Sequence, residues 1–563
     1  MDIDDGKKYG SYVAESPNNG EKAYDDVQHG ETRDNADELQ RHLGNRQIQL
    51  IAIGGSIGTA LFVSIGGALN KAGPGSLFMA YTFYSLVMGM VNNSIAEMSI
   101  YMPVSGGFIR LAGHWVDEAL GFAAGWNFFL YEALLIPFEI TALHTVLSFW
   151  RDDIPVWGVA IAVIILYGAC NVLAVQAYGE AEFWLSGGKV ILIFMLYCFT
   201  FITMVGGNPK KDAYGFRYWN KPGAMREYLS EGTKGEFEGF LAALWAASFC
   251  IVGPEYISMV AGEAKRPRTY IKNAYKTVYW RYGIFFILGA LCVGIVCPFN
   301  DPQLEAVNNG GSGGGTAAAS PYVIAMRNLG ISALPDLTNA LLVTSIFSAG
   351  NTYTYAASRS LYSLSVQGQA PKFLRKCTKN GVPIWCFAVV MCFPFLSFLA
   401  VSSASNEVLT WLVGLLTASG LINFIIMLLT YIAFFKACQA QGIDRKSLPY
   451  CGWFQPYQTY FALVFEILVV FCAGYTVFLP GNFTYDGFFT SYTMIGVTPC
   501  LYVFWKFFKK TKIVSSKQVD LSWDAPLIDA YEASFVSPPT GFWTEIIQLV
   551  GFRRGIRDDV RNV

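Results

Sequence analysis

The stretch GGSIGT, Gly54 to Thr59, lies in the middle of the first long apolar segment of the chain, which begins near Gln47. Each glycine weakens a helix by about 0.5 to 1 kcal/mol. Glycines also allow two helices to pack closely, which is the alternative interpretation. Because Ser56 and Thr59 add hydroxyl groups beside the glycines, we favour a broken helix whose free backbone N–H groups face an anionic ligand.

A second interruption lies in the sixth apolar segment, where Gly253 and Pro254 precede Glu255. Proline has no backbone N–H and clashes with the preceding helical turn. Interruptions in two corresponding segments are typical of transporters that bind their substrate between two structural repeats. The pattern therefore predicts that spans 1 to 5 and spans 6 to 10 are inverted repeats.

The rest of the chain is dominated by apolar segments. About 20 mostly apolar residues cross a bilayer as one helix, and roughly twelve such segments follow one another. They begin near Gln47, Ser76, Ala119, Pro155, Phe183, Phe237, Trp280, Leu334, Pro383, Glu407, Gln458 and Tyr485. Charged residues make up 14% of the 563 residues, well below a soluble protein's typical share of about 25%. These features predict an all-α polytopic membrane protein.

The segments divide the chain into three regions. We expect a disordered cytoplasmic N-terminal tail over residues 1–46, which is polar and acidic. Residues 47–508 are expected to form the transmembrane transporter domain, and residues 509–563 a cytoplasmic C-terminal tail. Within that tail, an amphipathic stretch from Phe542 to Arg554 is expected to rest on anionic membrane lipid.

The orientation follows from two basic loops, which lie between the sixth and seventh spans and between the eighth and ninth. Their residues are Lys265, Arg266, Arg268, Lys272, Lys276 and Arg281, then Arg359, Lys372, Arg375, Lys376 and Lys379. The positive-inside rule places both loops in the cytoplasm, and an even number of spans then places both termini there. The loop over residues 206–236 and the sequon Asn482-Phe483-Thr484 fall outside, where a glycan can be attached.

Several other classes of protein are disfavoured. The sequence has 40 Lys and Arg residues against 41 Asp and Glu residues. It therefore does not predict the strongly basic surface that nucleic-acid binding requires. The four His form no HExxH motif, the 12 Cys are scattered, and the Gly-rich run Asn308 to Gly315 lacks the lysine of a phosphate loop. We therefore expect no metal, no cofactor and no enzymatic activity.

Six sequence blocks carry a resemblance to a known family. They are GGSIGTALF (Gly54 to Phe62), EMSIYMPVSGGF (Glu97 to Phe108), YGEAEFWLSGGKVI (Tyr178 to Ile191), VAGEAKRPR (Val260 to Arg268), SPYVIAMRNLGI (Ser320 to Ile331) and SRSLYSLSVQGQAPK (Ser358 to Lys372). From about Gln47 to Lys510 the chain resembles the fungal amino-acid permeases of the amino acid, polyamine and organocation superfamily. The order of the blocks is specific for the family but not for one substrate.

The resemblance implies five plus five inverted repeats with two added helices, discontinuous spans 1 and 6, and an amino-acid site at the two breaks. The substrate carboxylate would lie at the first break and the amine near backbone carbonyls of the second. The expected substrate-binding residues are Ser56, Ile57, Gly58, Thr59, Phe249, Gly253 and Glu255. Phe249 stands where such permeases place an aromatic gate, and simple core packing is the other interpretation.

Ionisable residues inside spans cost at least about 2.5 kcal/mol to insert, so they are functional candidates. Lys189 lies in the fifth span, where proton-coupled relatives place a lysine between spans 1, 5 and 8, although it could also snorkel to the interface. Its expected partners in the eighth span are Thr344, Ser345 or Ser348.

The third span contains two carboxylates. Glu139 matches a family glutamate and is the second candidate for proton coupling. Glu132, seven residues earlier, lies on the same helical face. The pair could relay a proton, but for Glu132 we favour a place near an aqueous vestibule.

Three positions depart from the family pattern: Ala60 replaces a glycine, Pro254 a threonine, and Ile251 an aromatic residue. The leading hypothesis is a plasma-membrane transporter that imports amino acids by proton symport with alternating access. The alternatives are a polyamine or carnitine permease and a transporter-like nutrient sensor. A channel is disfavoured because the sequence shows no rings of charge along a pore. In similar permeases such tails direct endocytosis, so Lys7, Lys8 and Lys22 are candidate targets of ubiquitin ligase machinery; a merely solvated tail is the alternative.

Overall fold

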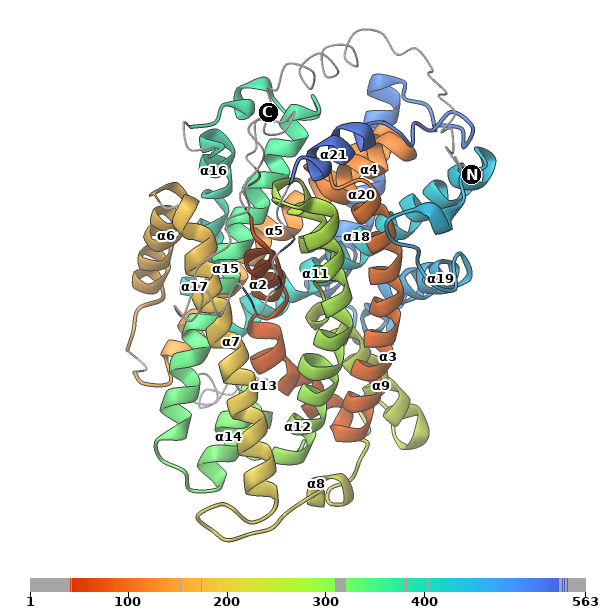
Figure 1. The fold of residues 1–563 in the computed structure, drawn as a ribbon. Coiled ribbons are helices and arrows are strands. Elements are labelled where there is room, and N and C mark those ends of the chain that lie inside the picture. The colour runs from red at the N-terminus through yellow and green to blue at the C-terminus, as the bar shows by residue number, and fades with distance from the viewer. Residues whose placement is uncertain are drawn as a thin grey trace, which may run out of the picture.

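A computed structural model shows the chain as a bundle of long helices (Figure 1). It describes residues 41, 43–151, 153–173, 175–308, 320–378, 382–402, 405–535, 539, 541 and 544. Within these ranges, the side chains of residues 54, 56, 173–183, 307–308, 402 and 405–407 are not described. Nearly all of the predicted tail 1–46 with its lysines, most of the Gly-rich run and most of the stretch from Phe542 to Arg554 lie outside the described residues.

The secondary structure is helical throughout. The longer helices are α2 (Asn45–Ser56), α3 (Ile65–Tyr101), α5 (Glu118–Leu147), α6 (Val156–Leu173), α7 (Val175–Met204), α9 (Gly232–Cys250), α11 (Pro267–Arg281), α15 (Leu334–Val366), α18 (Ser405–Ala440), α19 (Tyr457–Cys472) and α20 (Tyr485–Lys509). The shorter ones are α4 (Gly107–Trp115), α8 (Arg217–Asn220), α10 (Pro254–Met259), α12 (Leu288–Val296), α13 (Pro302–Asn308), α14 (Pro321–Asn328), α16 (Ile384–Val390), α17 (Leu399–Ser402) and α21 (Ala525–Ala533). Single turns of π- or 3-10 helix are η1 (Ala60–Ser64), η2 (Ala261–Glu263), η3 (Tyr282–Ile287), η4 (Lys372–Arg375), η5 (Phe393–Phe398), η6 (Arg445–Ser447) and η7 (Tyr475–Phe478). An isolated bridge joins Leu43 to Ala264.

Eight of the described helical segments are long and apolar enough to cross a membrane. They are Ala60–Tyr101, Glu118–Leu147, Trp184–Met204, Gly232–Met259, Pro267–Val296, Ile384–Val401, Val408–Ala440 and Tyr485–Lys509, with shorter apolar helices at Val156–Val172 and Tyr457–Cys472. The all-α polytopic fold is thus confirmed, whereas the number of twelve spans stays a prediction. The first of these segments contains a sharp bend at Gly73, whose φ is 78° and which precedes Pro74, close to the predicted start of the second span.

The predicted helix starts are accurate where an apolar segment follows a loop. The starts expected near Ala119, Pro155, Leu334 and Tyr485 lie within one residue of α5, α6, α15 and α20. The start expected near Trp280 is wrong, because α11 already begins at Pro267. Part of the predicted basic loop is therefore a polar helical extension, which a search for apolar segments cannot detect.

Helix α5 lies at the centre of the bundle and packs against α15, α18 and α20, while α3 packs against α9. A buried polar network ties three of these helices together. Asn127 on α5 donates to Asn423 on α18 at 2.8 Å, and Thr498 on α20 donates to Asn127 at 3.0 Å. Interhelical hydrogen bonds of this kind fix helix positions in an apolar solvent.

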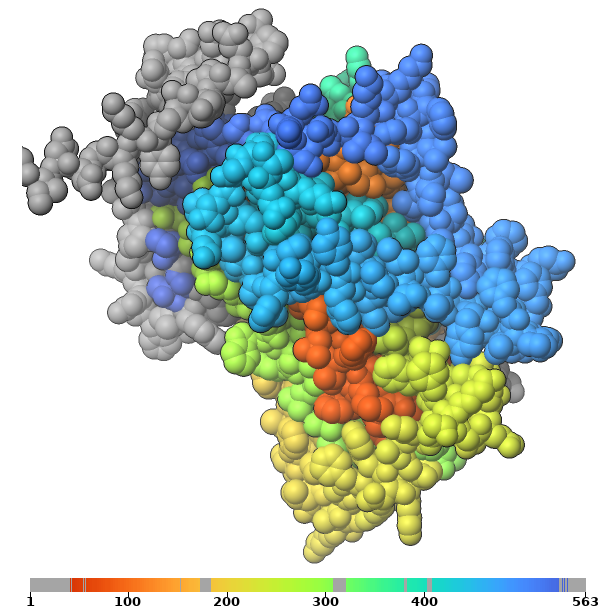
Figure 2. All heavy atoms as spheres, turned by 90° about the vertical axis from the view of Figure 1, so that its right-hand side faces the viewer, coloured from red at the N-terminus to blue at the C-terminus, as the bar shows by residue number. Residues whose placement is uncertain are grey.

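The residues after α20 pack across one end of the bundle (Figures 1 and 2). Trp523 stacks on His114 of α4 with ring centroids 3.9 Å apart, and burial lowers the pKa of His114, so the stacked ring is uncharged at neutral pH. Arg268 of the predicted basic region pairs with Asp529 of α21. The loop that carries α8 lies at the opposite end. The two classes of loop are therefore separated, as the predicted orientation requires.

Candidate substrate site at the two helix breaks

The first break lies where the sequence predicts it. Helix α2 ends at Ser56, and Ile57 adopts an extended backbone conformation with φ −117° and ψ 99°. The chain becomes helical again at Thr59 and continues as a π-helical turn from Ala60. The side chain of Ser56 lies outside the described residues, so the first break is defined by Ile57, Gly58 and Thr59.

The second break separates α9 from α10. Gly253 has φ 143° and ψ −36°, a conformation that favours glycine because it has no Cβ. Pro254 then starts α10, where its missing N–H costs nothing. The N–H of Gly253 donates to Oε2 of Glu255 at 3.0 Å. The Glu255 carboxylate is thereby held directly beside the break.

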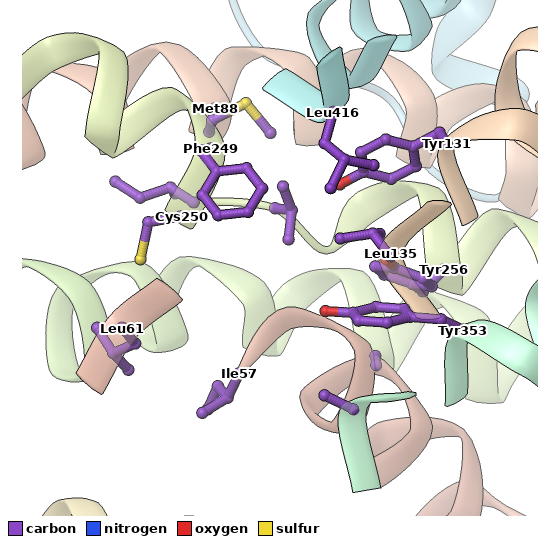
Figure 3. Packing of buried hydrophobic residues seen from close by; sticks show 14 of the residues in the cluster. Ile57, Leu61, Met88, Tyr131, Leu135, Phe249, Cys250, Tyr256, Tyr353 and Leu416 are labelled. Atoms are coloured by element: carbon purple, nitrogen blue, oxygen red, sulfur yellow. The ribbon is translucent and has the colours of Figure 1, made fainter. Parts of the chain in front are cut away.

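The two breaks and the eighth predicted span, α15, lie side by side (Figure 3). Tyr353 of α15 donates its hydroxyl hydrogen to the carbonyl of Gly55 at 3.1 Å. A Cβ added to Gly55 would lie 3.0 Å from the Tyr256 ring of α10. Tyr256 and Tyr353 have ring centroids 6.3 Å apart. Residues from three helices, two of which carry the predicted breaks, therefore meet at one place in the bundle.

Glu139 reaches the first break from α5. The hydroxyl of Thr59 donates to Oε2 of Glu139 at 2.5 Å, and the Thr59 N–H lies 3.5 Å from Oε1. Gly58 is equally close, since a Cβ there would lie 2.7 Å from Oε1 and 3.2 Å from the Cβ of Ala349. In this conformation the Glu139 carboxylate accepts the Thr59 hydrogen bond that we expect the substrate carboxylate to accept.

Lys189 reaches the same break from α7. Its side chain is buried, and Nζ donates to the carbonyl oxygen of Ile57 at 2.8 Å. The break exposes this carbonyl because the extended residue ends the regular helical ladder. Of the expected partners on α15, Thr344 is exposed and donates to its own helix at Leu341, so it does not contribute to the break.

Phe249 lies at the end of α9, directly before the second break. It is 7% exposed and packs edge-to-face on Phe138 of α5 with ring centroids 5.4 Å apart. The position suits both a gate that covers the substrate and a core aromatic residue. Substitution of Phe249 distinguishes the two roles.

Replacement of Phe249 by alanine is expected to weaken substrate binding and to relax selectivity, because an aromatic lid contacts substrate and excludes water. Uptake kinetics across a panel of amino acids would measure the effect, which we expect to be roughly two- to tenfold in KM, the range that a lost aromatic contact provides. Phe138→Ala is the matched control, since it removes the packing partner alone. Equal loss for every substrate in both variants would identify Phe249 as a packing residue.

Sequence reasoning missed the tyrosines of the site, Tyr131, Tyr256 and Tyr353. Aromatic residues are so common in apolar segments that their type alone carries little information. The only usable signal was the phenolic hydroxyl, which needs a partner when it is buried. Glu132 differs from its expected place near an aqueous vestibule, because its side chain is fully buried.

An ion pair joins two helices of the candidate site on the side of the bundle that carries the basic residues. Arg359 of α15 pairs with Glu263 of η2 at 3.2 Å, and Tyr355 donates to the other oxygen of Glu263 at 2.7 Å. The Arg359 side chain is 11% exposed and the Glu263 side chain 12%. Because Glu263 follows α10 and Arg359 continues α15, the contact joins the two helices directly beyond the break.

Comparisons with known proteins place this geometry in a family. A family model described as amino acid permease matches residues 47–518. The chain is 44% identical to the general amino acid permease AGP2 of Saccharomyces cerevisiae, over 88% of this chain and 84% of the relative. It is 38% identical to the proline-specific permease of Emericella nidulans, over 86% and 88%. The dicarboxylic amino acid permease of Saccharomyces cerevisiae is 37% identical, over 87% and 80%. This chain therefore belongs to the amino acid permease family, whose members named here are transporters, not enzymes.

Proposed function

We propose that this protein is a secondary active transporter that imports amino acids across the plasma membrane by proton symport. The observation that carries the proposal is the pair of adjacent helix breaks with one buried base and one buried acid, Lys189 and Glu139, hydrogen-bonded to the first break. Broken helices are weak points at which a bundle can rearrange around a bound substrate.

The contact between Glu139 and Thr59 supplies a reason for coupling. A substrate carboxylate that approaches the first break meets the carboxylate of Glu139 on the same donor group. Two negative charges repel strongly in a buried site. A proton on Glu139 removes its charge and frees the Thr59 hydroxyl from its anionic acceptor. Substrate and proton are therefore expected to bind together, which is the thermodynamic requirement of symport.

The contact between Arg359 and Glu263 supports alternating access. It closes the end of the bundle that the positive-inside rule assigns to the cytoplasm. An ion pair that is almost buried costs several kcal/mol to break singly, so it holds one state until the helices separate together. Inward opening then requires α10 and α15 to part beyond the breaks.

The test is uptake by the full chain in reconstituted vesicles and in cells that lack their own permeases. Acidic, basic, neutral and cyclic amino acids, spermidine and carnitine each serve as labelled substrate, with and without an inward proton gradient. Accumulation of an amino acid above its outside concentration, lost when a protonophore collapses the gradient, is the expected result. Accumulation of spermidine or carnitine alone would establish the polyamine or carnitine alternative, and no accumulation of any compound would favour a sensor.

The orientation in the membrane follows from the same transport function. We infer that both termini are cytoplasmic and that exposed apolar residues on the outer helices, such as Trp157 on α6 and Phe201 on α7, contact membrane lipid. We also propose that ubiquitin ligase machinery acts on Lys7, Lys8 and Lys22. These residues lie outside the described part of the chain.

A further inference from the structure

Two buried carboxylates beside the breaks lack the partners that such groups need. Glu132 of α5 is 0% exposed, and neither of its oxygens accepts a hydrogen bond from any residue that the structure describes. Glu255 of α10 is 1% exposed; one oxygen accepts from the N–H of Gly253, and the other has no partner within the same described residues. Three carboxylate oxygens are therefore left unsatisfied at one level of the bundle.

The two groups are also close enough to affect each other. Glu132 on α5 and Glu255 on α10 interact electrostatically, and the Tyr256 hydroxyl lies beside Glu132. Across the described ranges, neither forms an ion pair with a basic side chain. Burial of an unpaired charge is so costly that a carboxylate in such a place either carries a proton or faces a cation.

Three tyrosines surround the pair. Tyr256 interacts with Glu132, Glu255, Tyr131 and Tyr353, and its own hydroxyl has no hydrogen-bond partner among the described residues. Figure 3 shows the rings of Tyr131, Tyr256 and Tyr353 gathered on one side of the breaks, with Leu135 between them. Aromatic faces combined with carboxylates are the chemistry that proteins use to bind ammonium groups, because the ring quadrupole attracts positive charge.

We propose that Glu132 and Glu255, with these tyrosines, form a cation subsite that binds a second ammonium group of the substrate, in addition to its α-amino group. The proposal rests on the transport function proposed above and specifies its substrate class as basic amino acids.

A cation accounts for the geometry better than a stored proton does. A single shared proton forms one O–H···O hydrogen bond and so satisfies only two of the three oxygens. A primary ammonium has three N–H donors, one for each unsatisfied oxygen. Glu139 differs from this pair because it already accepts from Thr59. The chain thus separates Glu139, which accepts from a side chain at the first break and is suited to coupling, from two carboxylates whose remaining oxygens are suited to recognition.

The experiment compares L-lysine with L-norleucine, which is lysine without its side-chain amine. Purified full-length protein is heated with each compound, and the concentration that gives half of the maximal thermal stabilisation is measured. Lysine is expected to act at a concentration at least roughly tenfold lower than norleucine, the difference that charge-assisted hydrogen bonds provide. Equal or better stabilisation by norleucine would overturn the subsite without any variant being needed.

Variants then assign the effect to residues. Glu132→Gln keeps the shape and removes the charge, so it is expected to lose the preference for lysine while norleucine is bound as before. Glu466→Gln is the matched control, because Glu466 is equally buried and lies on α19, outside the two breaks; one of its oxygens accepts from Tyr84 at 3.3 Å and the other has no partner among the described residues. Equal weakening of both ligands by Glu132→Gln would show a structural or proton-carrying role instead. Failure of the transport function is distinguished separately, as absence of gradient-driven uptake of any compound.

Discussion

A Gly58→Leu variant is expected to reach the membrane but to lose substrate uptake almost completely. The space beside Gly58 is already filled, since even a Cβ would lie 2.7 Å from the Glu139 carboxylate and 3.2 Å from Ala349. A leucine must push α5 and α15 away from the break. Overpacking of this kind costs about 1 to 3 kcal/mol, and a loss of that size in binding lowers affinity roughly 5- to 150-fold.

Gly168→Leu provides the matched control for this substitution. Gly168 lies on α6, and a Cβ added there meets no atom within 4 Å. The same change of residue should leave initial uptake rates close to those of the parent. Surface amounts of both variants are measured by labelling intact cells, so that lost uptake is not confused with lost protein. Parent-like uptake by Gly58→Leu would remove the substrate site from the first break.

Local backbone chemistry explains why the breaks could be predicted from the sequence. Glycine and proline change the backbone at their own positions, so the runs at Gly54 to Thr59 and at Gly253 and Pro254 identify the interruptions without any knowledge of neighbours. Lys189 and Glu139 were recognisable for a related reason, because a charge inside an apolar segment has a high cost wherever it lies.

The pairings across helices could not be predicted in the same way. Thr59 and Glu139 are 80 residues apart, and nothing local to either residue indicates the other. Tyr256 and Tyr353 resemble dozens of aromatic residues in the spans until the structure brings them to Gly55. Glu132 was assigned to a vestibule because exposure is the commonest remedy for a charge. Its burial without a hydrogen-bond partner in the described part of the chain is a property of the packed bundle alone.

The role of Lys189 depends on the difference between an ammonium and an amine as hydrogen-bond donors. A charged donor makes a hydrogen bond roughly twice as strong as a neutral one. The bond from Lys189 to the carbonyl of Ile57 holds α7 against the extended residue of the first break. If Lys189 loses its proton toward the cytoplasm, we expect this bond to weaken and α7 to separate from the break. Proton movement would thereby change the geometry of the substrate site.

A Lys189→Ala variant is therefore expected to lose pH-dependent accumulation while keeping part of its substrate binding, since the groups of the second break remain. Lys189→Arg stays charged at every physiological pH and is expected to hold the cycle in one state, with binding but no net uptake. Uptake into vesicles at several outside pH values, with the inside pH fixed, measures both effects.

Lys436→Ala, at an exposed position near the end of α18, is the control for removal of a positive charge and should retain the pH profile of the parent. Accumulation by Lys189→Ala with the pH dependence of the parent would leave Lys189 as a structural lysine that fills the space between α7 and α2. Coupling would then rest on Glu139 alone, the other ionisable group bound to the first break. Glu139→Gln, which cannot take up a proton in this range, would become the decisive variant.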